Sequence, residues 1–248
     1  MIIIKSFREI EQLKKANTIA AQVLHELKRW VAPGITTREL DQVAEEIIRS
    51  RGAVPAFKGY RGFPASLCAS INEEVVHGIP GSRKLNEGDI VSLDVGANLN
   101  GYYGDAAITL PVGQVDQEAR RLLQVTERAL SIAMDQARSG NRLSDISHAV
   151  QAWVEGQGFS VVRDFVGHGI GRSLHEEPQI PNFGSPHQGP RLEKGMVFAL
   201  EPMVNEGTYE VRMLSDGWTV VTADGKRSAH FEHTVAITDG EAELLSTL

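Results

Sequence analysis

Two aspartates near the middle of the chain stand on either side of a tight turn, where they could bind a metal ion. Between them lies Asn100-Gly101, a dipeptide that favours a two-residue type I′ hairpin turn. With this turn, Asp94 pairs with Ala107, and Asp105 points to the same face because side chains alternate along a strand. With Leu99-Asn100 as the loop, Asp94 would face Asp105 directly. Either register puts two carboxylates on one face.

Two carboxylates so placed repel each other unless one stays protonated or a cation lies between them. A metal ion is therefore one explanation of the pair. A solvent-exposed face, on which salt screens the repulsion, explains it about as well. The hairpin alone leaves both interpretations open, and more ligands are needed to decide.

Further candidate ligands follow in the second half of the chain. His168 is flanked by glycines, which let neighbouring backbone approach closely, and His175 follows it. The glycine spacing does not match G-x-G-x-x-G, and no Gly-Lys-Ser/Thr follows, so a phosphate-binding loop is disfavoured. Glu201 and Glu232 each stand at the margin of an apolar, strand-like run. Taken singly, each of these residues can be explained without a functional role. The two glutamates in particular would usually lie on the surface.

Helical periodicity predicts the elements that must position these side chains. A first helix is expected over about 8–31, with Ser6 and Glu9 at capping-box spacing. A second is expected over about 39–51, with Thr36 and Glu39 as its capping box. The first two elements of the chain are thus a long helix followed by a shorter one.

The same layout returns later, with a long helix over about 117–138 and a shorter helix that ends at Gly158. When Gly34 is laid onto Gly140, the apolar positions of the two shorter helices match without a gap. Chance alignment of two amphipathic helices is the alternative. We favour an internal duplication because the flanking glycines also coincide.

Strand-like stretches follow each helix pair, and they predict an α+β fold. They are expected at about 90–93, 106–110, 196–200 and 231–237. No Ser/Gly-rich linker separates the two halves, which disfavours two mobile modules. We therefore predict a single domain over residues 1–248, with internal halves of about 8–111 and 116–238.

Composition excludes several classes of protein. The 248 residues are 42% hydrophobic and 23% charged, as in folded domains rather than disordered chains. The net charge of −7 gives no general attraction for nucleic acid. Cys68, the one cysteine, cannot form an intrachain disulfide. With no apolar run that resembles a signal peptide or membrane span, we expect a cytoplasmic protein, or an organellar one if a transit peptide has been removed.

Several segments together resemble the type I methionine aminopeptidases, the small members of the pita-bread metallopeptidase superfamily. The likeness covers nearly the whole chain and rests on 72–80, the Asp94/Asp105 pair, 167–178, 201–203 and 231–234. It implies a pseudo-twofold α+β fold in which helices cover a curved antiparallel sheet. The implied activity is removal of the N-terminal initiator methionine from nascent proteins and peptides.

The resemblance implies two divalent metal ions, drawn from Co, Mn, Fe or Zn, for which this ligand set is suited. Asp105 and Glu232 would bridge both ions, Asp94 would chelate one, and His168 with Glu201 would complete the other. Water activated by the ions would attack the first peptide bond. Glu201 would also move the proton to the leaving amine.

Other site residues are implied by the same likeness. His175 would steady the oxyanion, and His77 would contact the scissile amide. Methionine would enter an apolar pocket beside these two histidines, lined by Phe57, Tyr60, Phe63, Cys68, Leu174 and Trp218. Cys68 has two alternative interpretations, as an inert filler or as a nucleophile.

Four positions depart from the usual family pattern. Phe57, Phe63 and Leu174 replace residues of different size or polarity, so they change the expected shape of the pocket. His230 stands where glutamine is usual and adds an imidazole two residues before Glu232. This imidazole could adjust how the metal ligands are held.

Two other functions remain open at this stage. One is another pita-bread aminopeptidase or a prolidase-like peptidase, and the other is a non-catalytic relative that binds peptides or RNA. The expected partner is a peptide or nascent chain that begins with methionine, with transient ribosome contact. We expect a monomer that neither binds nucleic acid stably nor associates with membranes.

Overall fold

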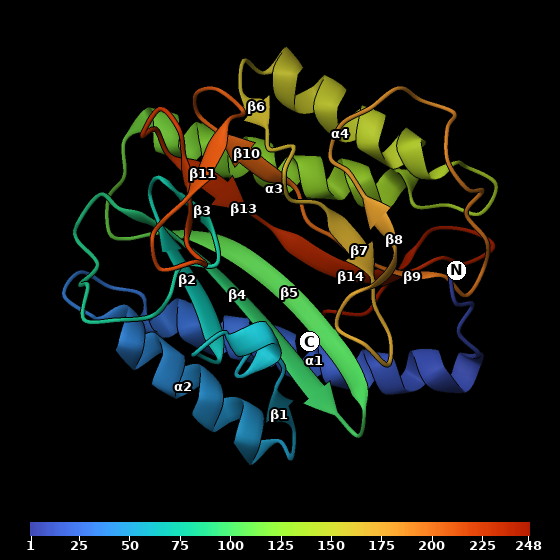
Figure 1. The fold of residues 1–248 in the computed structure, drawn as a ribbon, viewed down its shortest axis with the longest axis horizontal. Helices are drawn as coiled ribbons and strands as arrows, with labels where there is room; N and C mark the ends of the chain where they lie inside the picture. The colour runs from blue at the N-terminus through green and yellow to red at the C-terminus, as the bar shows by residue number, and fades with distance from the viewer.

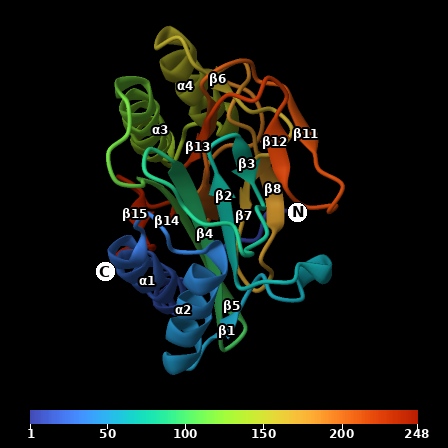
Figure 2. The ribbon, with the colours of Figure 1, turned by 90° about the vertical axis from the view of Figure 1, so that its left-hand side faces the viewer.

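A computed structural model describes all residues 1–248 and shows one large antiparallel sheet with four α-helices on one of its faces (Figures 1 and 2). The helices are α1 (Phe7–Trp30), α2 (Thr37–Ser50), α3 (Gln117–Gln136) and α4 (Leu143–Gly156). Strand order in the sheet is β1-β4-β5-β14-β9-β7-β8, with β2 also on β4 and β15 on β14. These strands are β1 (Val54–Pro55), β2 (Leu67–Ile71), β4 (Ile90–Leu99), β5 (Tyr102–Pro111), β7 (Gly167–Gly169), β8 (Glu176–Ile180), β9 (Val197–Leu200), β14 (Glu232–Ala236) and β15 (Glu243–Leu244).

Two small three-stranded sheets complete the fold. One has the order β13-β10-β6 and the other β11-β12-β3. Their strands are β3 (Glu74–Val76), β6 (Ser160–Val161), β10 (Met203–Asn205), β11 (Val211–Met213), β12 (Val220–Thr222) and β13 (Ser228–His230), and a 3₁₀ turn, η1, spans Tyr60–Gly62. None of the four α-helices combines the length and the apolar composition that a bilayer crossing demands.

The first two helices begin where their capping boxes predict. Ser6 and Glu9 exchange side-chain and backbone hydrogen bonds at the start of α1, and Thr36 and Glu39 do the same for α2. Each box satisfies backbone N–H groups that have no partner inside the helix. The predicted helix bounds were therefore close to the observed ones.

The central hairpin has the predicted turn and register. Asn100 and Gly101 have φ of 55° and 80°, as a type I′ turn requires at both central positions. Asp94 pairs with Ala107, and Asp105 pairs with Gly96. Direct pairing of Asp94 with Asp105, the alternative register, does not occur.

The predicted repeat is present in the backbone. Gly34 N–H donates to the carbonyl of Leu85 at 2.8 Å, and Gly140 N–H donates to the carbonyl of Leu192 at 3.0 Å. Helices α2 and α4 follow these contacts at the same offset that relates Gly34 to Gly140, and each has 14 residues. The pseudo-twofold α+β architecture expected from the sequence is thus observed.

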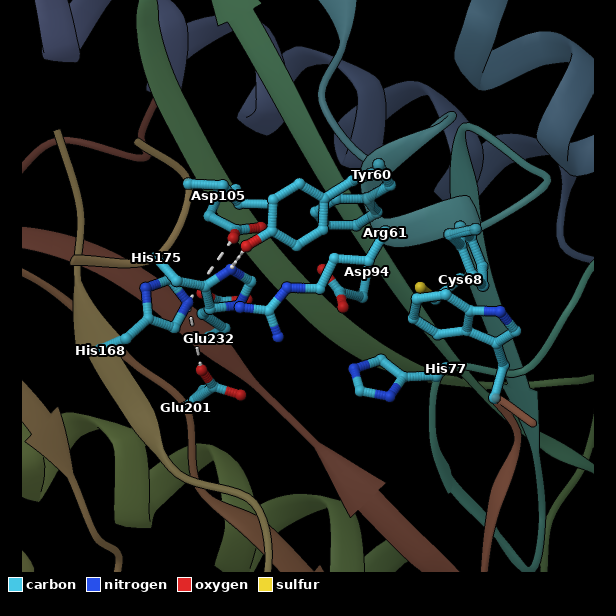
Figure 3. Close-up of a pocket in the computed structure, with 14 residues that line it drawn as sticks. Tyr60, Arg61, Cys68, His77, Asp94, Asp105, His168, His175, Glu201 and Glu232 are labelled. Carbon is cyan, nitrogen blue, oxygen red and sulfur yellow. Dashed lines mark hydrogen bonds and ion pairs between the residues drawn. The ribbon is translucent and has the colours of Figure 1, made fainter. Parts of the chain in front are cut away.

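Helix α1 packs closely on β5, and this contact positions one of the predicted ligands. A Cβ on Gly104 would overlap the backbone of Ala16 and Asn17, so only glycine permits the approach. The buried Asn17 side chain accepts a hydrogen bond from the Asp105 N–H at 3.1 Å. The helix layer therefore holds β5 from behind, and Asp105 faces the opposite side of the sheet (Figure 3).

The strand prediction was incomplete. Its four stretches overlap β4, β5, β9 and β14, but β1, β2, β7, β8, β15 and the two small sheets were not predicted. Strand β7 consists of Gly-His-Gly, which has neither alternation nor β-branched side chains. It is held by pairing with β8 and β9, so partners distant in the sequence form it.

Candidate metal centre and active site

Five neighbouring strands supply the five predicted metal ligands. The order β4-β5-β14-β9-β7 carries Asp94, Asp105 and Glu232 within strands, Glu201 just after β9, and His168 within β7. Asp94 and Glu232 both pair with Ala107, and directly paired residues share a face of the sheet. The five side chains therefore converge on one side of the sheet, opposite the helices (Figure 3).

The cluster is tight enough to hold a cation. One ligand atom from each of Asp105, His168 and Glu232 lies within 4.8 Å of the other two. His168 Nε2 lies 3.5 Å from Glu201 Oε1 and 3.8 Å from Asp105 Oδ2. Carboxylate oxygens and one imidazole nitrogen at such spacing form a donor set suited to divalent metals.

The flanking glycines explain how His168 reaches this cluster. A Cβ on Gly167 would lie 2.5 Å from the carbonyl oxygen of Ala199 in β9. A Cβ on Gly169 would overlap the carbonyl oxygen of Glu177. Glycine on both sides lets the neighbouring backbones close around His168, as predicted from the sequence.

Several polar atoms of the cluster have no hydrogen-bond partner. Buried Asp94 Oδ1, Asp105 Oδ1, Glu232 Oε1 and His230 Nε2 are all unsatisfied. Native proteins rarely leave such atoms unpaired, because each loses its hydration without compensation. Unpartnered carboxylate oxygens that face a shared space fit bound divalent cations.

Burial disfavours the ionised forms of the clustered carboxylates. It raises the pKa of Asp94 to about 7 and that of Glu201 to about 8. The pKa values of Asp105 and Glu232 are also raised, first by burial and then by the neighbouring carboxylates. A cation between them would reverse these shifts by favouring the charged forms.

The histidines of the cavity are neutral at physiological pH. Burial lowers the pKa of His168 to about 3 and those of His77 and His175 to about 4. The contact between His168 and Glu201 is therefore not an ion pair. A neutral imidazole is the form that coordinates metals.

An apolar region adjoins the cluster in the same cavity of about 150 Å³. The Phe63 ring packs edge-on against the Trp218 ring, with centroids 5.1 Å apart. Cys68 is buried, and burial raises the pKa of its thiol, which disfavours the thiolate that a nucleophile needs. The structure brings every predicted pocket residue to this cavity, namely Phe57, Tyr60, Phe63, Cys68, Leu174 and Trp218 with His77 and His175.

Two further histidines line the cavity, His175 beside His168 and Tyr60, and His77 on the side of Cys68 (Figure 3). His175 Nδ1 is 2.9 Å from the Tyr60 hydroxyl, and its ring centroid is 4.2 Å from that of His168. His77 is held by edge-on contacts with Phe165 and Trp218. Both imidazoles are thus oriented by aromatic neighbours at the cavity wall.

His230 lies behind the cavity rather than in its wall. It is 2% exposed, and its Nε2 is 3.6 Å from Glu201 Oε2. The unusual imidazole therefore contacts a predicted ligand directly.

One residue that lines the cavity, Arg61, was not predicted from the sequence. It lies in η1, between Tyr60 and Gly62, and is exposed to solvent. An arginine in a glycine-rich turn is usually a surface residue, and the motifs that carry the resemblance do not include it. The placement of Tyr60 and Phe63 in the pocket was the signal that could have pointed to it.

Comparison with known proteins shows the family to which this chain belongs. The model of metallopeptidase family M24 matches residues 11–239, and the chain belongs to this family. Together with the buried cluster, this membership indicates a site for divalent metal ions. Relatives that match over the whole chain are methionine aminopeptidases. This chain is 56% identical to methionine aminopeptidase 1 of Bacillus subtilis, with 99% of each chain covered, and 56% identical to the methionine aminopeptidase of Clostridium perfringens, with 100% of each covered.

Solved structures agree with this placement. The crystal structure of methionine aminopeptidase from Thermotoga maritima matches with a TM-score of 0.99 and 50% identity, and all of each chain is covered. The prolidase from Pyrococcus horikoshii matches with a TM-score of 0.81 at 22% identity, and 64% of that chain is covered. The second likeness shows the fold alone. The fold is thus the pita-bread fold expected from the sequence.

Proposed function

We propose that this chain removes the N-terminal methionine from peptides and nascent proteins by hydrolysing their first peptide bond. Two divalent ions, of Co, Mn, Fe or Zn, would be held by Asp94, Asp105, His168, Glu201 and Glu232. The observation that carries this proposal is the convergence of four buried or half-buried carboxylates and a neutral imidazole, with unsatisfied oxygens, beside an apolar pocket. Relatives that match over the whole chain and are named methionine aminopeptidases support it.

Bound divalent ions would supply Lewis acidity, which polarises a carbonyl and lowers the pKa of water. The protein side chains handle the proton. Glu201 lies at the edge of the cluster, with its carboxylate oxygens near His168 and His230, where it could accept a proton and then deliver it to the leaving amine. The role of Glu201 is therefore that of both ligand and proton shuttle.

The two cavity histidines would act on the peptide bond itself. Neutral His175 has one ring nitrogen engaged by Tyr60, so the other nitrogen is free to donate to the developing oxyanion. His77, on the side of Trp218, would contact the amide of the scissile bond. Methionine fits the apolar region because its flexible thioether packs well against aromatic rings.

The substrate sets the expected location and partners. Initiator methionine is exposed on chains leaving the ribosome, so we place the protein in the cytoplasm, in transient contact with the ribosome. We also propose that the protein acts as a monomer.

Hydrolysis of the tripeptide Met-Ala-Ser by the purified protein tests the proposal. Release of free methionine, and no cleavage of a peptide with a blocked N-terminus, is the expected result. A protein that binds Met-Ala-Ser with metal present but never cleaves it would instead be a peptide-binding relative. If the protein instead hydrolysed Xaa-Pro dipeptides as fast as Met-Ala-Ser, the result would favour the prolidase-like alternative.

A further inference from the structure

Arg61 carries the one permanent positive charge among the side chains that line the cavity. The other lining residues are carboxylates, histidines, aromatic residues, Leu174 and Cys68. The guanidinium has no hydrogen bond or ion pair with any residue of the chain, and its Cζ lies 5.4 Å from the centroid of the Tyr60 ring. A charged fork of five N–H donors is therefore left free at the cavity.

The backbone of the turn directs Arg61 toward the cavity. Its φ and ψ of 49° and 22° lie in the left-handed region, which residues with a side chain rarely adopt. The turn is closed by hydrogen bonds from the Gly59 N–H to the Phe63 carbonyl at 2.8 Å and from the Phe63 N–H to the Tyr60 carbonyl at 2.9 Å. Tyr60 and Phe63 both line the cavity, so the same turn that builds the pocket wall presents the guanidinium at its rim (Figure 3).

The position of this rim determines which part of a peptide meets Arg61. Phe63, Cys68 and Leu174 are buried and close the apolar end of the cavity, whereas Arg61 is exposed. With the first side chain in the apolar end and the first peptide bond beside His175, the rest of the peptide must leave across the exposed rim. Arg61 would then face the residues that follow the scissile bond.

We propose that Arg61 is a specificity residue that favours substrates with an acidic side chain shortly after the scissile bond. This inference rests on the proposed aminopeptidase function. Guanidinium groups pair with carboxylates through two parallel hydrogen bonds, and like charges at the same place repel. An alternative role, in which Arg61 only offsets the charge of the cavity carboxylates, would affect all substrates equally.

Three amidated peptides, Met-Ala-Glu-Ala, Met-Ala-Gln-Ala and Met-Ala-Lys-Ala, separate these roles. With Mn²⁺-loaded protein, kcat/KM should rank Glu above Gln above Lys, with steps of about two- to five-fold, as for an exposed ion pair. Arg61→Gln should remove the ranking, and Arg61→Glu should invert it. Non-hydrolysable analogues of the three peptides should show the same rankings in their Kd, and 0.5 M salt should compress them.

Arg128→Glu is the matched control, because Arg128 is an exposed arginine in α3 without an ion pair, on the helical side of the sheet. It makes the same change in net charge and should keep the wild-type ranking. If wild type treats the three peptides alike, or if Arg61→Glu lowers all three rates equally, the inference is wrong although the aminopeptidase function stands. Cleavage of none of the three by the wild-type protein would refute the function as well.

Discussion

Glu201 has contacts that no other carboxylate of the site combines. It follows the last residue of β9, and its main-chain carbonyl accepts a hydrogen bond from the Asn182 side chain at 3.0 Å. Its two carboxylate oxygens lie near His168 and His230 respectively. A fixed backbone with a side chain between two imidazoles suits a group that must bind a metal and also move a proton.

Replacement of Glu201 by glutamine should therefore remove catalysis and leave the fold intact. The amide has nearly the same size but cannot accept and return the proton, so kcat on Met-Ala-Ser should fall about 10²–10⁴-fold. The thermal unfolding midpoint of the metal-free variant should not fall below that of the metal-free wild type. An unchanged kcat would contradict the role assigned to Glu201.

His230 offers a second test among single residues. Its side chain touches Glu201 from behind, and groups that hold metal ligands in place typically contribute about 10- to 100-fold to metal affinity or activity. We expect His230→Gln to weaken Mn²⁺ binding by about 10-fold, measured by calorimetry. If neither the affinity nor the rate on Met-Ala-Ser changed, His230 would have no influence on the site.

Among the larger elements, the loop that carries His175 is tied to the N-terminal segment by a buried ion pair. Lys5 Nζ lies 2.6 Å from Glu176 Oε2, and the two side chains are 5% and 8% exposed. The other oxygen of Glu176 accepts hydrogen bonds from the backbone N–H groups of Arg172 and Ser173. The pair therefore holds the loop in which His175 precedes Glu176.

Breaking this pair should lower both the free energy of unfolding and kcat. Lys5→Met leaves a buried carboxylate without its partner, which typically costs about 3–5 kcal/mol in the free energy of unfolding. Urea unfolding and kcat on Met-Ala-Ser measure the two effects. Lys14→Met is the matched control, since the Lys14–Glu243 pair is 43% and 39% exposed and should contribute about 1 kcal/mol or less. Equal losses in the two variants would contradict the role of the buried pair.

Elements governed by local chemistry could be predicted from the sequence, and those made by distant partners could not. Asn100-Gly101 sets its own turn, and this placed Asp94 opposite Ala107 correctly. His168 was recognised by its glycines, but the strand around it exists only because β8 and β9 pair with it. Arg61 was missed because its importance comes from where the turn lies in three dimensions.

Across the whole molecule, the metal-free protein should lose stability as the pH rises above neutrality. The pKa values of Asp94 and Glu201 are raised to about 7 and about 8, so the folded state binds more protons than the unfolded state, in which these groups ionise near pH 4. Their contribution to stability is fully present below the unfolded values and is lost as the pH rises through the folded ones.

Histidines with lowered pKa, such as His77 and His175, have the opposite effect, because they make stability rise with pH. They do so only below about pH 6.5, where histidines of the unfolded state are protonated. Between pH 7 and 9 the carboxylates therefore dominate. The thermal unfolding midpoint of chelator-treated protein should fall across this range, and saturating Mn²⁺ should abolish the fall because it binds the ionised carboxylates. A midpoint of the metal-free protein that rises with pH over this interval would contradict the electrostatic account.

The proposed function requires that the five converging side chains hold divalent ions. Its most direct test is a titration of metal-stripped protein with Mn²⁺, in which bound metal and Met-Ala-Ser hydrolysis are measured in the same samples. We predict negligible hydrolysis without metal and a rate that rises with occupancy until two ions are bound per chain. Full activity in the stripped protein, or no binding of metal while the protein stays folded, would contradict this requirement.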